Sequence, residues 1–150
     1  MKPKIPQSIL SGHENLCSEL KDIIAAGGNI GEKAQMLDNV TSPHFEKEEK
    51  YAFPPLGFLL ALSEGNWEID ATEAIKMAET LQEKLSELKI EHQNISRSLH
   101  ELKIVAEAED NPSAKLFVKD LQLHIEIEDQ VLYPATILVG NYLKHIKPNL

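Results

Sequence analysis

Two segments of the chain, residues 44–54 and 124–134, carry the same arrangement of histidine and acidic side chains. Each begins with a histidine, has a glutamate four residues later and a second acid five residues later, and ends with an aromatic residue followed by proline. An internal repeat reflects a repeated structural unit. Here the repeated side chains are imidazole and carboxylate, which mid-row divalent metals prefer as ligands. The repeat is therefore one of candidate metal ligands.

A further histidine precedes each segment at nearly the same interval. His13 lies 31 residues before His44, and His92 lies 32 residues before His124. All four fall on the apolar stripe of a predicted helix, so each of four helices would bury one imidazole. A lone histidine on such a stripe is more often a hydrogen-bonded core residue than a ligand. Four histidines at matched positions indicate a shared metal site instead.

Two glutamates complete the predicted site. Glu48 and Glu128 each follow a histidine by four residues, which puts the carboxylate one helical turn further along the same face. Burying four imidazoles and two carboxylates without partners would be costly, at about 1–3 kcal/mol for each unsatisfied polar group and more for each charge. A cation at the centre would remove this cost.

Six side chains exceed the four donors that one tetrahedral zinc ion takes. They suit a pair of ions, with two histidines on each and both glutamates bridging, as in the carboxylate-bridged pairs of helix-bundle cores. With a bridging oxide or hydroxide, each ion would keep one position open for oxygen, peroxide or nitric oxide. We predict two iron ions, with manganese or zinc as alternatives. The predicted ligands are His13, His44, Glu48, His92, His124 and Glu128.

The elements that must position these residues are predicted to be helices, because apolar residues recur with a helical period almost throughout. The predicted helices cover approximately residues 9–23, 31–53, 71–109 and 112–146, with a short helical turn at 56–62. Glycine, asparagine and proline lie between them, and Asp70 with Glu73 resembles an N-terminal capping box. No segment predicts a strand. The pattern favours an all-α fold, an antiparallel up-down-up-down four-helix bundle.

Two prolines should modify these helices. Pro43 lies inside the second helix, and we predict a local distortion there that aims His44. Pro134 should kink or interrupt the fourth helix before residues 135–146 continue it. Val40 and Val131 are expected on the buried stripes of these two helices.

Length and composition favour an ordinary globular protein. We predict that residues 1–150 form a single domain, since 150 residues can bury a substantial core. The 24 acidic and 15 basic residues give a net charge of −9, which argues against nucleic acid or an anionic membrane as partner. The single cysteine, Cys17, forms no internal disulfide, and no signal peptide or membrane-length apolar run is visible. A cytoplasmic protein is expected.

The motifs resemble those of the hemerythrin-like (HHE) cation-binding domains. The resemblance covers the chain from Ile5-Pro6 to about Tyr142 and implies a non-haem di-iron site in an antiparallel four-helix bundle, with the same six residues as ligands by position. It rests on His13, His44-x-x-x-Glu48-Glu49, Glu91-His92, and His124-x-x-x-Glu128-Asp129 followed by Leu132-Tyr133-Pro134.

Two positions depart from the oxygen-carrying hemerythrins. Those proteins have a second histidine one turn after the ligand on the third helix, where this chain has Ser96. Their last motif has aspartate five residues after histidine, whereas this chain offers both Glu128 and Asp129. We favour Glu128 because it matches Glu48 in the repeat. The missing histidine makes reactive or sensing members of the family, including those linked to iron sensing or to repair of damaged iron centres, closer models than reversible oxygen carriers.

The sequence thus predicts a di-iron protein that binds or reacts with O2, peroxide or nitric oxide as carrier, sensor or scavenger. Metal storage, a metal-responsive interaction module that folds only when loaded, and a di-iron peroxidase-like enzyme are the alternatives. The expected partner is a small diatomic molecule or peroxide, with neither nucleic acid nor a membrane.

Five other residues lie close to the predicted ligands in sequence. Cys17, one turn after the first histidine, is more simply a packing residue than a redox partner. Tyr51 could donate a hydrogen bond to an oxygen species at the metals, although a buried tyrosine with a satisfied hydroxyl is commoner, and Tyr133 ranks below it. Glu49 and Asp129 could orient ligands, though solvated helix faces explain them equally well.

Overall fold

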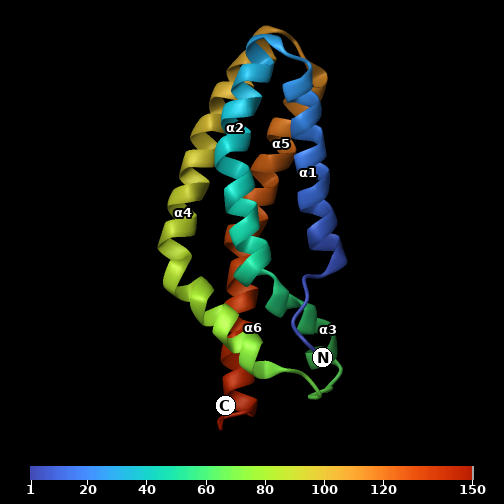
Figure 1. Cartoon of the computed structure of the whole chain (residues 1–150), viewed down its shortest axis with the longest axis vertical. Helices are drawn as coiled ribbons and strands as arrows, with labels where there is room; N and C mark the ends of the chain where they lie inside the picture. The colour runs from blue at the N-terminus through green and yellow to red at the C-terminus, as the bar shows by residue number, and fades with distance from the viewer. Residues whose placement is uncertain (150) are drawn as a thin grey trace.

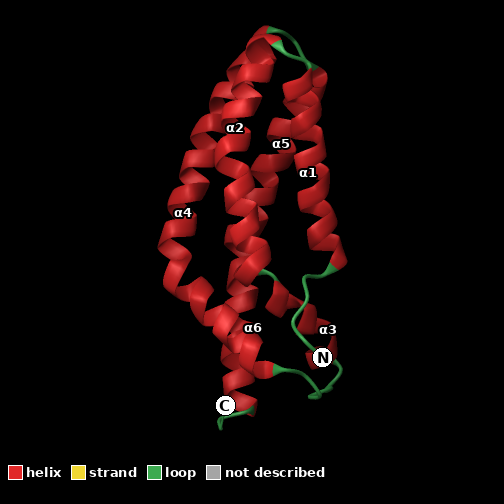
Figure 2. Cartoon of the chain, in the orientation of Figure 1, coloured by secondary structure: helices red, strands yellow, loops and turns green. Residues whose placement is uncertain are grey.

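The computed structural model describes residues 1–149 and is helical almost throughout (Figures 1 and 2). The α-helices are α1 (Gln7–Ala25), α2 (Gly28–Lys47), α3 (Leu59–Ser63), α4 (Ala71–Ala108), α5 (Pro112–Ile127) and α6 (Tyr133–Ile146). Two π-helical turns, η1 (Glu48–Ala52) and η3 (Glu128–Leu132), and a 3-10 turn, η2 (Pro54–Phe58), connect them. Residues 1–149 contain no strand, so the all-α prediction is confirmed.

The long helices lie beside one another along the long axis of the molecule (Figure 1). Helix α4 contacts α2, α5 and α6, and α1 contacts α2 and α5. The turn η3 joins α5 to α6, so that the two helices follow one another as one long segment. The short helix α3 lies near the N-terminus at one end of the molecule.

The core is divided along this axis into apolar clusters. One cluster joins residues of α1, α2, α4 and α5, among them Leu20, Leu37 and Leu102. A second surrounds Leu88 and Tyr133, from α4 and α6. On α4 the predicted ligand His92 lies between these two clusters, one turn from Leu88, so the candidate site is enclosed by hydrocarbon along the helix axis.

The helix termini agree with those predicted from the sequence except at the start of α2 and at the cap of α4. Helix α2 begins at Gly28 rather than near residue 31, because Gly27 and Gly28 adopt positive φ angles of 72° and 68° and make the turn from α1. Asp70 precedes α4 as predicted, but its side chain makes no capping hydrogen bond. Asn111 does cap α5, since its side chain accepts a hydrogen bond from the backbone N–H of Ala114.

The predicted distortion at Pro43 is wrong. Helix α2 is regular through Pro43, which lies on the exposed side, where water can hydrate the carbonyl left without a partner. The distortions come instead at the repeated glutamates. The N–H of Phe53 bonds to the carbonyl of Glu48, and that of Tyr133 to the carbonyl of Glu128, each five residues back. The interruption predicted around Pro134 is therefore present, immediately before that proline.

The predicted burial of Val40 and Val131 is also wrong. Val40 is 37% exposed, because Thr41 occupies the buried position of that turn in α2. Val131 is 55% exposed. It lies within η3, where the wider π-helical turn brings Tyr133, five residues after Glu128, onto the inner face in its place.

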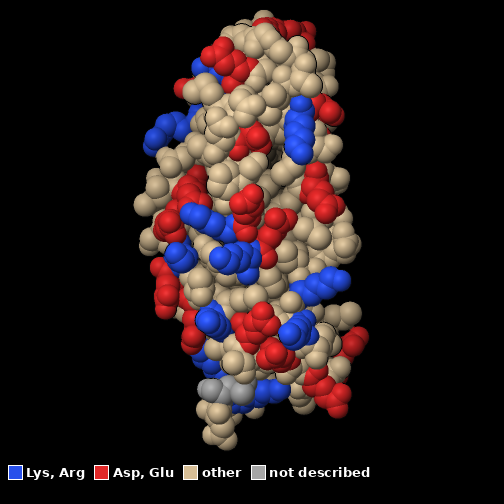
Figure 3. Space-filling model, in the orientation of Figure 1, with Lys and Arg blue, Asp and Glu red and all other residues tan. Residues whose placement is uncertain are grey.

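The outer surface is mixed in charge. On the face shown in Figure 3, lysine and arginine side chains are interspersed with acidic ones. Within the described part of the chain, no helix combines the length and apolar character needed to cross a membrane.

Candidate metal centre

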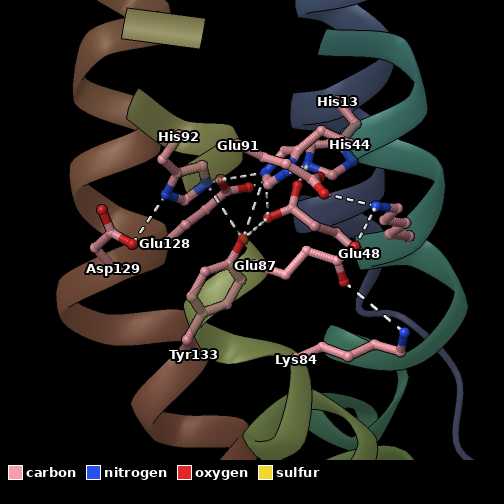
Figure 4. Close-up of polar contacts among 11 residues, drawn as sticks. His13, His44, Glu48, Lys84, Glu87, Glu91, His92, Glu128, Asp129 and Tyr133 are labelled. Atoms are coloured by element: carbon pink, nitrogen blue, oxygen red, sulfur yellow. Dashed lines mark hydrogen bonds and ion pairs between the residues drawn. The ribbon is translucent and has the colours of Figure 1, made fainter. Parts of the chain in front are cut away.

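The six predicted ligands converge between the helices, and Figure 4 shows five of them directed toward one another. Helices α1, α2, α4 and α5 each contribute one histidine, and the two π-helical turns contribute the glutamates. Both carboxylates are 0% exposed. His13, His44 and His92 are also buried, whereas His124 lies nearer the surface. The residues that the repeat singles out therefore share one enclosed space.

Their donor atoms form two groups, and within each group all the donor atoms lie within 4.8 Å of one another. The His44/His92 half consists of His44, Glu48, His92 and Glu128. The His13/His124 half consists of His13, His124 and Glu128. Glu128 belongs to both: Oε1 is 3.1 Å from His92 Nε2, whereas Oε2 is 2.8 Å from His124 Nε2 and 3.3 Å from His13 Nε2. A single carboxylate thus turns one oxygen toward each histidine pair.

The two oxygens of Glu48 also face different histidines. Its Oε2 lies 3.3 Å from His44 Nε2, and its Oε1 lies 3.4 Å from His13 Nε2. The group of mutually close donors around His13 and His124 includes Glu128 only, and Glu48 Oε1 approaches it through His13. This arrangement is what two bridging carboxylates would require of a pair of ions.

Several of these buried atoms lack hydrogen bonds. Among the described residues, Glu48 Oε1 and His124 Nε2 have no hydrogen-bond partner, although His124 Nε2 lies only 2.8 Å from Glu128 Oε2. Close approach without hydrogen-bond geometry is expected of ligands that face a common cation rather than each other. Leaving such atoms unpaired in a buried site is costly, so the donor set fits a metal.

The outer nitrogens of two histidines have carboxylate partners. His44 Nδ1 lies 2.9 Å from Glu91 Oε1, and Glu91 also accepts a hydrogen bond from Lys47 at 2.6 Å (Figure 4). His92 Nδ1 lies 2.9 Å from Asp129 Oδ1. When Nδ1 donates to these acids, the lone pair of Nε2 faces the centre.

These contacts assign different places to the two acids of the last motif. Glu128 is at the centre, whereas Asp129 is half-exposed and meets only the outer side of His92. Glu49 has a similar but looser position, 3.6 Å from His13 Nδ1. The sequence singled out Glu91 only as the neighbour of His92 in the motif, and nothing in its spacing indicates that it contacts His44.

Without metal, protons balance the buried charges. Burial alone would lower the pKa of the histidines, but hydrogen bonds with Glu128 and Glu48 raise it to about 9 for His13 and about 10 for His44. Burial would raise the pKa of Glu128, yet its histidine partners, His124 first, hold it well below its usual range. The histidines therefore favour the ionised form of the Glu128 carboxylate.

Tyr133 was ranked below Tyr51, and the structure reverses that order. The Tyr133 hydroxyl donates to Glu48 Oε2 at 2.5 Å, and its ring stacks on His92 with centroids 5.5 Å apart and planes 10° apart. Burial raises its pKa. The hydroxyl of Tyr51 is buried without a hydrogen-bond partner in residues 1–149. The available signal was the repeat itself, which pairs Tyr133 with Phe53.

The remaining neighbours are ordinary. Cys17 is half-buried against the apolar core, and burial raises the pKa of its thiol, as in a packing residue. Ser96, which stands where oxygen carriers have an additional histidine, is exposed. The ring of Phe45 stacks on His13 at 4.0 Å and covers the His13/His124 half with hydrocarbon.

Comparison with known proteins gives one match. The family model described as the hemerythrin HHE cation binding domain matches residues 7–136, a span that includes all six predicted ligands. No curated protein and no solved structure matches the chain.

Proposed function

The chain belongs to the hemerythrin HHE cation-binding domain family, and from this premise we propose that it is a non-haem di-iron protein. It binds or reacts with O2, peroxide or nitric oxide as carrier, sensor or scavenger. The ligands in this proposal are His13, His44, Glu48, His92, His124 and Glu128.

One observation carries the proposal: each buried carboxylate places one oxygen beside a histidine of the His44/His92 half and the other beside a histidine of the His13/His124 half. Four imidazole nitrogens and two carboxylates shared between two ions would suit iron, manganese or zinc. Iron, when bound, would supply redox chemistry and coordination positions for a small ligand. The chain itself orients the imidazoles through Glu91 and Asp129 and keeps water away with the Phe45 ring.

The proposal extends to the finer architecture. We propose that residues 1–150 form a single domain, an antiparallel up-down-up-down four-helix bundle in which α5, η3 and α6 make the fourth member. The closed sequence of contacts supports it, because α1 contacts α2, α2 contacts α4, α4 contacts α5 and α5 returns to α1. The short connections between α1 and α2 and between α4 and α5 also favour antiparallel neighbours.

The net charge and the single cysteine support the remaining parts of the proposal. A charge of −9 disfavours nucleic acid and anionic membranes as partners, which leaves a small molecule as the ligand. One cysteine gives no sign of an oxidising compartment, so we place the protein in the cytoplasm.

Metal quantification after anaerobic purification tests the dinuclear site. We expect two iron ions per chain, and a lower content in His92→Ala. His100→Ala is the matched control, because His100 is an exposed histidine on the same helix and should leave iron content unchanged. One ion per chain in the native protein would reject a dinuclear site, and unchanged loading of His92→Ala would reject this ligand set.

Oxygen titration of the iron-loaded protein then separates the functions. An absorption change that reverses when oxygen is removed supports a carrier or sensor. Turnover of peroxide with consumption of a reductant favours the peroxidase-like enzyme. Loss of helicity on chelation without any ligand chemistry favours the metal-responsive module.

A further inference from the structure

The hydroxyl oxygen of Tyr133 lies within the His44/His92 half of the site (Figure 4). It is 3.2 Å from His92 Nε2, 3.4 Å from His44 Nε2 and 2.5 Å from Glu48 Oε2. Nitrogen and oxygen donors sit about 2.0–2.2 Å from a divalent ion, which separates neighbouring donors by roughly 3 Å. The distances from the hydroxyl oxygen to the candidate ligand atoms are therefore similar to the distances among the ligand atoms themselves.

The hydroxyl oxygen also lies among atoms that would present lone pairs in a loaded site. There, both imidazoles would donate from Nδ1 to their outer carboxylates, which leaves Nε2 of His44 and of His92 free to bind an ion, as is Glu48 Oε2. The phenol oxygen faces the same three atoms. A cation between them could be shared by all four.

The other half of the site has no such group. In the repeat, Phe53 occupies the position of Tyr133, and both follow their glutamate by five residues across a π-helical turn. The Phe53 ring lies 5.6 Å from that of His13, but it has no hydroxyl. With Tyr133, the His44/His92 half has five donor atoms, whereas the His13/His124 half has three close to one another and is bordered by the rings of Phe45 and Phe53.

We propose that Tyr133 is a seventh metal ligand that binds only the ion of the His44/His92 half. This inference rests on the dinuclear site proposed above. On binding, a bond forms between the phenol oxygen and the metal, the O–H bond breaks, and the proton leaves to solvent, as protons do when metals bind to titratable ligands. The two ions are then unequal, and the ion of the His13/His124 half keeps more positions open for an external ligand.

Ferric iron bound to a phenolate gives a charge-transfer band in the visible and phenolate ring vibrations in resonance Raman spectra, which makes the proposal testable without activity. The native protein loaded with ferric iron should show both signals. Tyr133→Phe should lose them while keeping its iron, because the substitution preserves the ring that stacks on His92. Tyr51→Phe is the matched control, since Tyr51 is also buried but its hydroxyl contacts none of the candidate ligands, so the signals should stay intact.

A second variant serves if Tyr133→Phe does not fold. The chain has three tyrosines, so the double variant Tyr51→Phe, Tyr142→Phe leaves Tyr133 as the only phenol. Persistence of the signals in this variant assigns them to Tyr133. Their loss there would overturn the assignment, as would their survival in Tyr133→Phe.

The outcomes distinguish this inference from the proposed function. A native protein that binds two iron ions without phenolate signals would overturn the role of Tyr133 and leave the dinuclear site standing. A protein that binds one ion, with phenolate signals that Tyr133→Phe abolishes, would overturn the dinuclear site and support the tyrosine ligand.

Discussion

At the scale of single residues, Glu91 fixes the orientation of the His44 ring and so the direction in which His44 Nε2 points. Glu91 accepts from His44 Nδ1 at 2.9 Å and is itself held by Lys47 at 2.6 Å. We expect Glu91→Gln to reduce metal affinity about 10–100-fold, because such partners fix the ring orientation and raise the basicity of the ligand. Competition with a chelator of known affinity measures the change.

Glu87→Gln is the control for this prediction. Glu87 lies one turn from Glu91 on α4 and contacts the same Lys47, but it meets no histidine. Its substitution should leave metal affinity unchanged. An equal loss in both variants would mean that surface charge near the site, rather than support of His44, accounts for the effect.

The ligand residues of the site could be predicted from the sequence, but their supporting residues could not. The six ligands were predictable because their residue types and their spacing both repeat, and a helical period places them on the inner faces of the helices. Glu91 gives no comparable signal, because many exposed acids on α4 have the same period. The site of Tyr133 depends on the π-helical turn before it, and an α-helical period predicts Val131 there instead.

At the scale of elements, the two π-helical turns set the register of the site. A proline follows each turn, at residues 54 and 134. A proline in a regular helix would clash with the carbonyl four residues back and lack an N–H for it, and a wider turn relieves both conditions. We expect Pro134→Ala to favour a regular helix, rotate Tyr133 away from Glu48 and His92, and weaken metal binding in a chelator competition.

Pro43→Ala provides the comparison within the same chain. Pro43 lies in regular helix on an exposed face, so its replacement restores a hydrogen bond without changing any register. We expect the free energy of unfolding in urea to rise by about 1–3 kcal/mol, with metal affinity unchanged. If Pro134→Ala also left metal affinity unchanged, proline would not be what maintains the π-helical turn.

The elements themselves were largely predictable, because the apolar period and the glycine and proline breaks specify where the helices lie. The distortion was assigned to the wrong proline. Pro43 and Pro134 are both exposed, so exposure does not separate them. The π-helical turns instead begin at Glu48 and Glu128, the repeated glutamates, and an apolar period alone does not reveal where a helix widens in this way.

At the scale of the whole molecule, a charged centre lies between apolar clusters, so the metal-free protein must neutralise it with protons. His13 and His44 have pKa values of about 9 and 10 in the folded chain, against 6.5 ordinarily. Because the folded pKa is raised, this stabilisation is complete below pH 6.5 and is lost as the pH rises toward 9–10. The free energy of unfolding of the metal-free protein should therefore fall progressively from about pH 6.5 to 10.

Metal loading should reverse this dependence. Metal ions compete with the same protons for the imidazoles, so metal affinity rises with pH, and the stabilisation gained on loading rises with it. Urea unfolding of the metal-free and loaded forms at pH 7 and about pH 9.5 measures both trends. His44→Gln removes one of the raised groups and should flatten the metal-free dependence, whereas His100→Ala, on the exposed side of α4, should leave it unchanged. A metal-free protein equally stable at both pH values would show that these histidines are not held protonated by the buried carboxylates.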